Sequence, residues 1–205
     1  MISKALRISF KKYKINPVIR TLILTDLTFW SASNLLAPIF AVFVVEELTG
    51  GSIEIVGIAA TLYLFARSLT EIPVGIILDK LKGEKDDLFS IMIGNFLTGI
   101  IFFTFPFVVK SVEALYIYQV LLGAVFALSA PGWYTIFTRH IDKDEEGFEW
   151  GLYDVVISIG MASTAAIGGF LAAEYGFDIV FYLVGGFMVL SGFVPLLVKD
   201  MVKER

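Results

Sequence analysis

The second long apolar stretch of the sequence contains an arginine and a glutamate, Arg67 and Glu71, that are four residues apart. Residues at this spacing share one face of a helix and can pair, and Tyr63 extends the same face by one turn. A charge near the middle of a bilayer costs at least about 2.5–3.5 kcal/mol. We interpret the three residues as part of a substrate or coupling site in a solvated cavity, with a structural ion pair as the alternative.

The first apolar stretch adds a second carboxylate, Asp26, at a depth similar to that of Glu71. Asn34 and Trp30 fall on the same helical face as Asp26, and Gln119 gives the fourth stretch a polar group. Polar and aromatic groups around a cavity suit an amphipathic or aromatic organic molecule better than an inorganic ion. The alternatives are ordinary helix packing and, for Asp26, a side chain that reaches the membrane interface.

Composition restricts the chemistry that the chain can perform. Among 205 residues there is no cysteine and one histidine, and no Gly-rich phosphate loop ends in Lys-Ser or Lys-Thr. We therefore expect neither an enzyme nor a cofactor, metal or nucleic-acid partner. The acidic segment around His140, with Asp142, Asp144, Glu145, Glu146 and Glu149, has no metal-ligand spacing and is interpreted as a solvated loop.

Long apolar blocks identify the chain as an all-α polytopic membrane protein. Apolar residues make up 57% of the chain and charged residues 18%, against about 25% in soluble domains. A helical span needs about 20 apolar residues. Six spans are predicted, at residues 21–45, 53–78, 88–109, 114–137, 152–173 and 178–198.

The spans form one predicted membrane domain, residues 21–198, between a basic tail at 1–20 and a short tail at 199–205. The third and sixth spans lack interior charges and are expected to face lipid. The other four hold the polar and small residues typical of helices that face protein or a water-filled cavity.

Basic residues predict the orientation. Fourteen of the sixteen Lys and Arg residues fall in segments on one side, and the opposite side holds only Lys110. Because cytoplasmic segments are enriched in Lys and Arg, we expect both termini on the cytoplasmic side of the plasma membrane.

Three segments resemble motifs of the major facilitator superfamily. Gly75-Ile-Ile-Leu-Asp79-Lys80-Leu-Lys82-Gly83-Glu-Lys85 resembles the family loop Gly-x-Leu-Ala-Asp-Arg-x-Gly-Arg-Lys, with Gly83 one residue late. Gly160-Met-Ala-Ser-Thr-Ala-Ala-Ile-Gly168-Gly169 resembles Gly-x-x-x-Gly-Pro-x-x-Gly-Gly, with Thr164 and Ala165 in place of the central pair. Gln119-Val-Leu-Leu-Gly123 resembles Arg-x-x-x-Gly, with glutamine in place of the arginine linked to proton coupling.

The resemblance implies a fold and a function. The fold is half of a major facilitator fold, two three-helix repeats. The function is secondary transport of small organic solutes, drug-like molecules or metabolites, by alternating access, with a proton or sodium ion as candidate coupling ion. Gly75, Asp79, Lys80 and Gly83 are implied to form a cytoplasmic gating loop.

Six helices supply only one half of such a transporter. We expect a parallel homodimer in the lipid bilayer, with contact through Gly160, Thr164, Gly168 and Gly169. The alternatives are a non-transporting membrane interaction or assembly protein and a truncated half of a twelve-helix transporter.

Overall fold

The computed structural model describes residues 14–81 and 83–202, so the start of the basic tail (1–13) and residues 203–205 lie outside the described part. Six helical segments in this part are long and apolar enough to cross a membrane. The first span comprises α2 (Pro17–Leu36), η2 (Ala37–Ile39) and α3 (Phe40–Glu47). The others are α4 (Ile53–Leu81), α5 (Lys85–Val108), α6 (Val112–His140), α7 (Glu146–Tyr175) and α8 (Phe177–Phe193) with η3 (Val194–Val198).

Local chemistry explains where the first span begins and bends. The Asn16 side chain accepts a hydrogen bond from the Val18 backbone N–H at 2.9 Å, and Pro17 occupies the first helical turn, where its missing N–H costs nothing. Pro38 lies in the 3-10 turn that separates α2 from α3. Proline breaks the helical hydrogen-bond ladder, so the span contains two helices.

The packing of the helices is that of two repeats of three. Besides the central pair α5 and α8, the main contacts are α4 with α6, α2 with α7, α5 with α6, and α2 with α8. The helices α2, α4 and α5 of the first repeat correspond to α6, α7 and α8 of the second. The α4–α6 contact therefore corresponds to the α7–α2 contact, and the α5–α6 contact corresponds to the α8–α2 contact. The predicted fold class is confirmed: six spanning helices arranged as two three-helix repeats.

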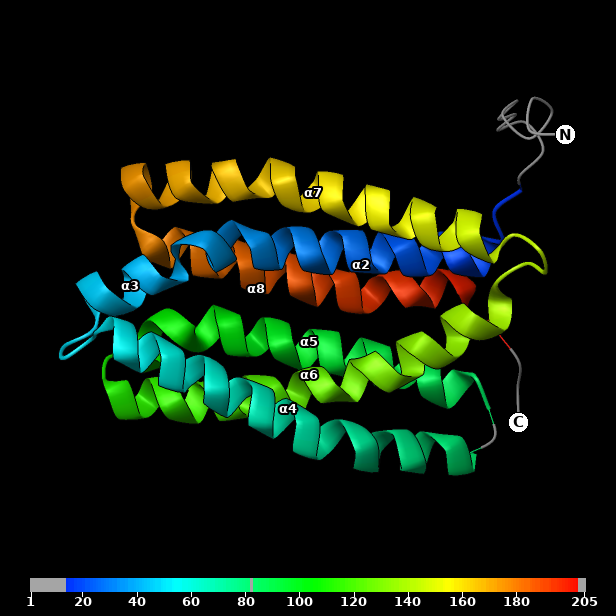
Figure 1. The fold of residues 1–205 in the computed structure, drawn as a ribbon, viewed down its shortest axis with the longest axis horizontal. Helices are drawn as coiled ribbons and strands as arrows, with labels where there is room; N and C mark the ends of the chain where they lie inside the picture. The colour runs from blue at the N-terminus through cyan, green and yellow to red at the C-terminus, as the bar shows by residue number, and fades with distance from the viewer. Residues whose placement is uncertain (1–13, 82, 203–205) are drawn as a thin grey trace, which may run out of the picture.

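The helices α4 and α7 lie at opposite edges of the bundle and are its least buried spans (Figure 1). By contrast, α5 and α8 pack closely together, with the Phe105 and Phe181 rings stacked at a centroid distance of 4.5 Å. The expectation that the third and sixth spans mainly face lipid is therefore wrong for one face of each. An aromatic-rich helix can place its rings against another helix as readily as against lipid.

Two glycines of α7 pack closely against α2 within the chain. A Cβ built on Gly168 would lie 1.8 Å from the Leu35 carbonyl oxygen of α2, and one on Gly160 would meet Leu27 and Ser31. Gly169 has no neighbour within 4 Å of such a Cβ.

Matched alanine substitutions should separate these roles. Gly168→Ala should lower the thermal unfolding midpoint of the purified chain, because overpacking against backbone costs about 1–3 kcal/mol. Gly169→Ala, one residue further on the same helix, should leave the midpoint unchanged or raise it, since alanine favours a helix by about 1 kcal/mol. Equal midpoints for the two variants would contradict the close α2–α7 approach.

Candidate functional site

Two adjoining cavities lie between the helices. The larger has a volume of about 350 Å³ and is mostly apolar, with Ser33, Tyr63, Thr98 and Gln119 as its polar contributors. Its remaining lining residues come from α2, η2, α3, α4, α5, α6 and α8: Phe29, Trp30, Leu36, Ala37, Phe40, Ala60, Phe102, Leu122, Phe126 and Met188. Its size and lining fit the apolar part of a small organic molecule.

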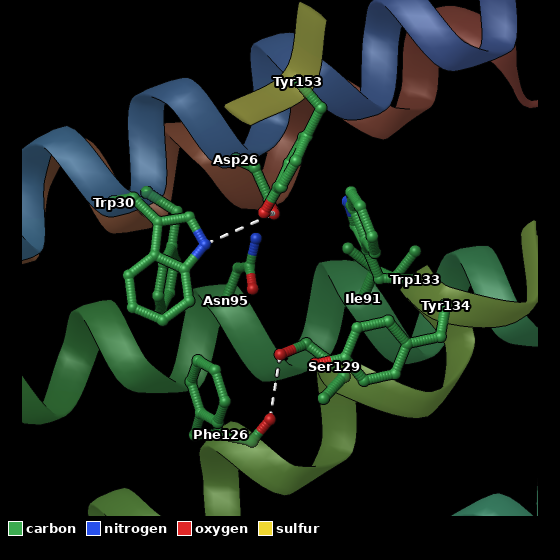
Figure 2. A pocket seen from close by; sticks show the side chains of 11 residues that line it. Asp26, Trp30, Ile91, Asn95, Phe126, Ser129, Trp133, Tyr134 and Tyr153 are labelled. Carbon is green, nitrogen blue, oxygen red and sulfur yellow. Dashed lines mark hydrogen bonds between the residues drawn. The ribbon is translucent and has the colours of Figure 1, made fainter. Parts of the chain in front are cut away.

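The smaller cavity, of about 60 Å³, is richer in polar groups (Figure 2). Its lining residues are Asp26, Phe29, Trp30, Ile91, Asn95, Phe126, Ser129, Ala130, Trp133, Tyr134 and Tyr153. Phe29, Trp30 and Phe126 line both cavities, and their rings pack with centroid distances of 5.5–5.8 Å. An aromatic partition therefore separates two compartments of different polarity.

Asp26 connects α2 to α7 at the smaller cavity. Its Oδ2 atom accepts a hydrogen bond from the Tyr153 hydroxyl at 2.9 Å and one from the Trp30 Nε1–H at 3.3 Å. Both bonds reach the same oxygen, and no basic side chain pairs with Asp26 among the described residues. The site thus contains a carboxylate that is hydrogen-bonded but not neutralised by a cation.

Arg67 and Glu71 pair with each other rather than with Asp26. The Arg67 Nε–H donates to the Glu71 carboxylate at 3.1 Å, and the guanidinium carbon lies 4.6 Å from the centroid of the Phe126 ring. Arg67 sits at the middle of α4, and Tyr63 on the same face lines the larger cavity. Arg67 contacts Phe126, whose ring lines both cavities. The charges of Arg67 and Glu71 therefore compensate each other beside both cavities.

The other predicted site residues differ in position. Gln119 is buried and lines the larger cavity. Asn34 lines neither cavity, because its amide donates to the Met161 carbonyl at 2.8 Å and joins α2 to α7. Its polarity therefore contributes to helix packing.

Sequence reasoning missed three polar residues of the smaller cavity: Asn95, Ser129 and Tyr153. Asn95 is buried in α5, which was expected to face lipid because it lacks charges. An asparagine inside an apolar span is itself a signal of helix contact, since a buried amide needs partners. The rest of the span is strongly apolar, so its overall composition did not indicate a helix contact at Asn95.

The family-like loop forms the end of α4 and the turn after it. Asp79 and Lys80 belong to the last turn of α4 and are exposed, whereas Gly83 is buried. A Cβ built on Gly75 would lie 3.7 Å from the Pro131 side chain on α6. The charged pair is thus available to a partner, and the two glycines lie within the fold.

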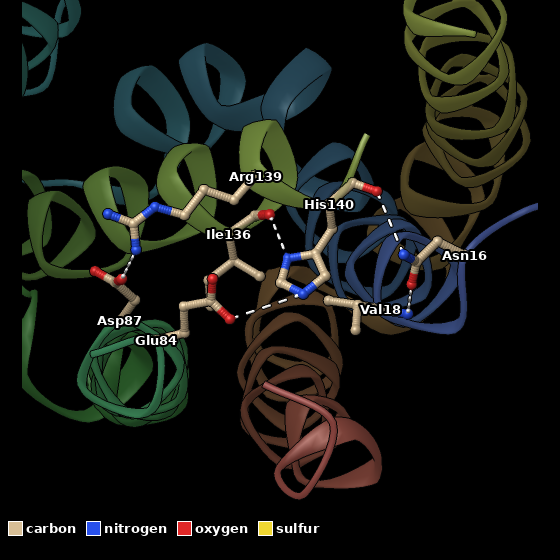
Figure 3. Close-up of polar contacts among 7 residues, drawn as sticks. All are labelled: Asn16, Val18, Glu84, Asp87, Ile136, Arg139 and His140. Atoms are coloured by element: carbon tan, nitrogen blue, oxygen red, sulfur yellow. Dashed lines mark hydrogen bonds and ion pairs between the residues drawn. The ribbon is translucent and has the colours of Figure 1, made fainter. Parts of the chain in front are cut away.

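Polar contacts join α5, α6 and the start of α2 at the same end of the bundle (Figure 3). Arg139 lies 3.7 Å from the Asp87 carboxylate, and His140 Nε2 lies 3.7 Å from the Glu84 carboxylate. The Asn16 amide donates to the His140 carbonyl at 3.4 Å. These contacts hold three segments together where α5 begins and α6 ends.

The interpretation of the acidic segment as a solvated loop is wrong for Glu149. Glu149 is fully buried and accepts a hydrogen bond from the Asp142 backbone N–H at 3.2 Å. The helical start of α7 carries Glu149 inward, which the composition of a short acidic segment cannot reveal. Within residues 14–81 and 83–202, no group of three or more His, Cys, Asp or Glu side chains is placed to hold a metal ion.

Comparison with known proteins identifies the family. The family model for the Major Facilitator Superfamily matches residues 22–205, which include all six spans. This chain belongs to the Major Facilitator Superfamily. Membership makes it a multi-pass membrane protein of a transporter family and points to transport rather than catalysis.

Relatives in the superfamily differ in length. The chain is 27% identical over 183 residues to the uncharacterized MFS-type transporter MJ1560 of Methanocaldococcus jannaschii, covering 89% of this chain and 46% of that protein. It is 27% identical over 168 residues to the multi-drug resistance efflux pump PmrA of Streptococcus pneumoniae, covering 80% of this chain and 40% of the pump. The chain thus spans about half the length of these relatives.

A shorter relative also matches. The uncharacterized MFS-type transporter YitZ of Bacillus subtilis is 26% identical over 165 residues, which cover 80% of this chain and 96% of YitZ. The match thus covers nearly all of this relative, whose length is close to that of the present chain.

Proposed function

We propose that this chain is one six-helix half of a secondary active transporter that moves small organic solutes by alternating access. The observation that carries the proposal is the pair of adjoining cavities, one apolar and one bearing Asp26, inside a bundle of a transporter family. The name of the pneumococcal relative, a multi-drug resistance efflux pump, supports drug-like molecules as a substrate class. Asp26 and Glu71 are the candidate binders of a coupling proton or sodium ion.

The second half is proposed to be a second copy of the chain. The exposed surface of α4 is strongly apolar, with Leu64, Phe65, Leu69 and Ile72 all more than half exposed, and α7 exposes Ile159 and Phe170 to a similar degree. A parallel two-fold pair would cover both helices and place the cavities toward a shared centre, as the halves of a fused transporter are related. The Bacillus subtilis relative, of which the match covers 96%, is of a similar short length and agrees with such an arrangement.

The end of the bundle that holds Pro17 and the α4–α5 turn is proposed to be cytoplasmic, in the plasma membrane, because the basic residues concentrate there. Asp79, exposed at this end, is proposed as a latch that steadies one conformation by contact with the second half.

The ion pair provides the first test. Arg67→Ala should reduce solute flux about ten-fold or more, because it removes the cation over Phe126 and leaves Glu71 unpaired in the membrane. Flux should be measured in reconstituted liposomes with a panel of neutral, anionic and cationic aromatic solutes. Glu113→Gln, which removes an exposed charge at the start of α6, is the control. If no solute moves with the unaltered chain, a role in assembly replaces transport, and normal flux in Arg67→Ala makes the pair structural.

If Asp79 acts as a latch, its substitution should change the rate of transport and leave solute affinity unchanged. Asp79→Asn should slow flux several-fold while leaving solute affinity unchanged, because Asp79 lines neither cavity. Affinity and flux should be measured on one reconstituted sample. Loss of both in proportion would show that Asp79 supports binding or folding instead.

The homodimer predicts crosslinks between copies. The chain has no native cysteine, so a cysteine at Leu69 on α4 and one at Ile159 on α7, both exposed and at a similar depth along their helices, report only on introduced positions. Mixed single-cysteine variants should give a disulfide-linked dimer after oxidation in liposomes. A cysteine at Phe103, on the exposed side of α5, is the control that should not crosslink. Flux from a chain that stays monomeric would overturn the homodimer.

A further inference from the structure

The two cavities differ in charge as well as in size. Arg67 and Glu71 neutralise each other, so Asp26 is the carboxylate whose charge no neighbouring cation compensates in this region. Both of its hydrogen bonds reach Oδ2, which leaves Oδ1 as a free acceptor. The smaller cavity is therefore suited to a cation that carries N–H donors.

A second polar atom in this cavity lacks a partner. Trp133 is only 5% exposed, and its Nε1–H is buried and makes no hydrogen bond within the described chain. The nitrogen-bearing edge of its ring is turned toward Asp26 (Figure 2). A buried donor without an acceptor is unfavourable, so a ligand that supplies an oxygen there would gain affinity.

The size of the cavity limits what can occupy it. Its volume of about 60 Å³ is small beside the 350 Å³ of the larger cavity, so it suits the polar head of a ligand rather than its body. A trimethylammonium head is bulkier than a primary ammonium and has no N–H to donate.

We propose that the two cavities bind one ligand in two parts: a protonated primary amine with a neighbouring hydroxyl, and an apolar or aromatic body. The ammonium donates to the Oδ1 atom of Asp26. The hydroxyl oxygen accepts from the Trp133 N–H. The body lies beside Phe29 and Phe126, which line both cavities, on the side of the larger cavity. This assignment names the substrate class of the transport site and rests on the proposed function.

Four ligands built on one skeleton test the proposal: 2-amino-1-phenylethanol, its N,N,N-trimethyl analogue, phenethylamine without the hydroxyl, and 1-phenylethanol without the amine. Binding to the purified full-length chain in nanodiscs is measured by titration calorimetry at neutral pH. The amino alcohol should bind about ten-fold or more tightly than 1-phenylethanol and the trimethyl analogue, and several-fold more tightly than phenethylamine. Equal binding of the amino alcohol and 1-phenylethanol, or no binding of any of the four, would overturn the proposal.

Two variants assign each preference to its residue. Asp26→Asn should abolish the preference for the amine over 1-phenylethanol, and Trp133→Phe should abolish only the preference for the hydroxyl. Glu46→Gln removes an exposed carboxylate from the same span and should keep both preferences. Unchanged preferences in Asp26→Asn or Trp133→Phe would contradict the assignment. The comparison of ligands in the unaltered chain decides the proposal even if a variant fails to fold.

Flux separates this inference from the proposed function. If the liposomes transport some solute but the amine preference is absent, the ligand class is wrong and transport stands. If the binding preferences hold but no solute moves, the site binds such amines and the chain does not transport alone.

Discussion

The interior of a bilayer contains no water, and this constraint governs the structure of the chain. Every backbone N–H and C=O must find its partner inside the protein, which helices achieve within themselves. Hydroxyl groups on these helices follow the same rule. Thr25 donates to the Thr21 carbonyl, Thr61 to the Gly57 carbonyl and Thr98 to the Gly94 carbonyl, each one turn back. Polar side chains that the backbone cannot satisfy locally must meet another helix.

Those inter-helix contacts connect the two repeats. Asn34 joins α2 to α7, and the Ser90 hydroxyl donates to the Leu128 carbonyl to join α5 to α6. Close approach at Gly168 brings α2 and α7 near enough for the Asn34 bond. The hydrogen bond between Tyr153 and Asp26 joins the same two helices further along, at the edge of the smaller cavity. Helix packing and the site are thus built from the same contacts.

Charge separates structural from ligand-directed groups within this bundle. Arg67 and Glu71 satisfy each other, and Arg139 with Asp87 and His140 with Glu84 tie helix ends together. Asp26 has hydrogen-bond donors but no cation. A carboxylate without a neighbouring cation can still bind a positive group. Asp26 is therefore a better candidate for ligand binding than the paired Arg67 and Glu71.

The six spans, the all-α class and the family could be predicted from the sequence, because apolar length and short loop motifs are local properties of the chain. The same holds for the pairing of Arg67 with Glu71, since both lie on one helix. The partners of Asp26 could not be predicted, because Tyr153 is 127 residues away and only the packing of α7 on α2 brings it near. Likewise, only the three-dimensional arrangement showed that Gly168 contacts α2 and that Asn95 and Trp133 share a cavity with Asp26. Which face of an apolar helix meets another helix depends on the shapes of both, and the sequence of one helix does not contain that information.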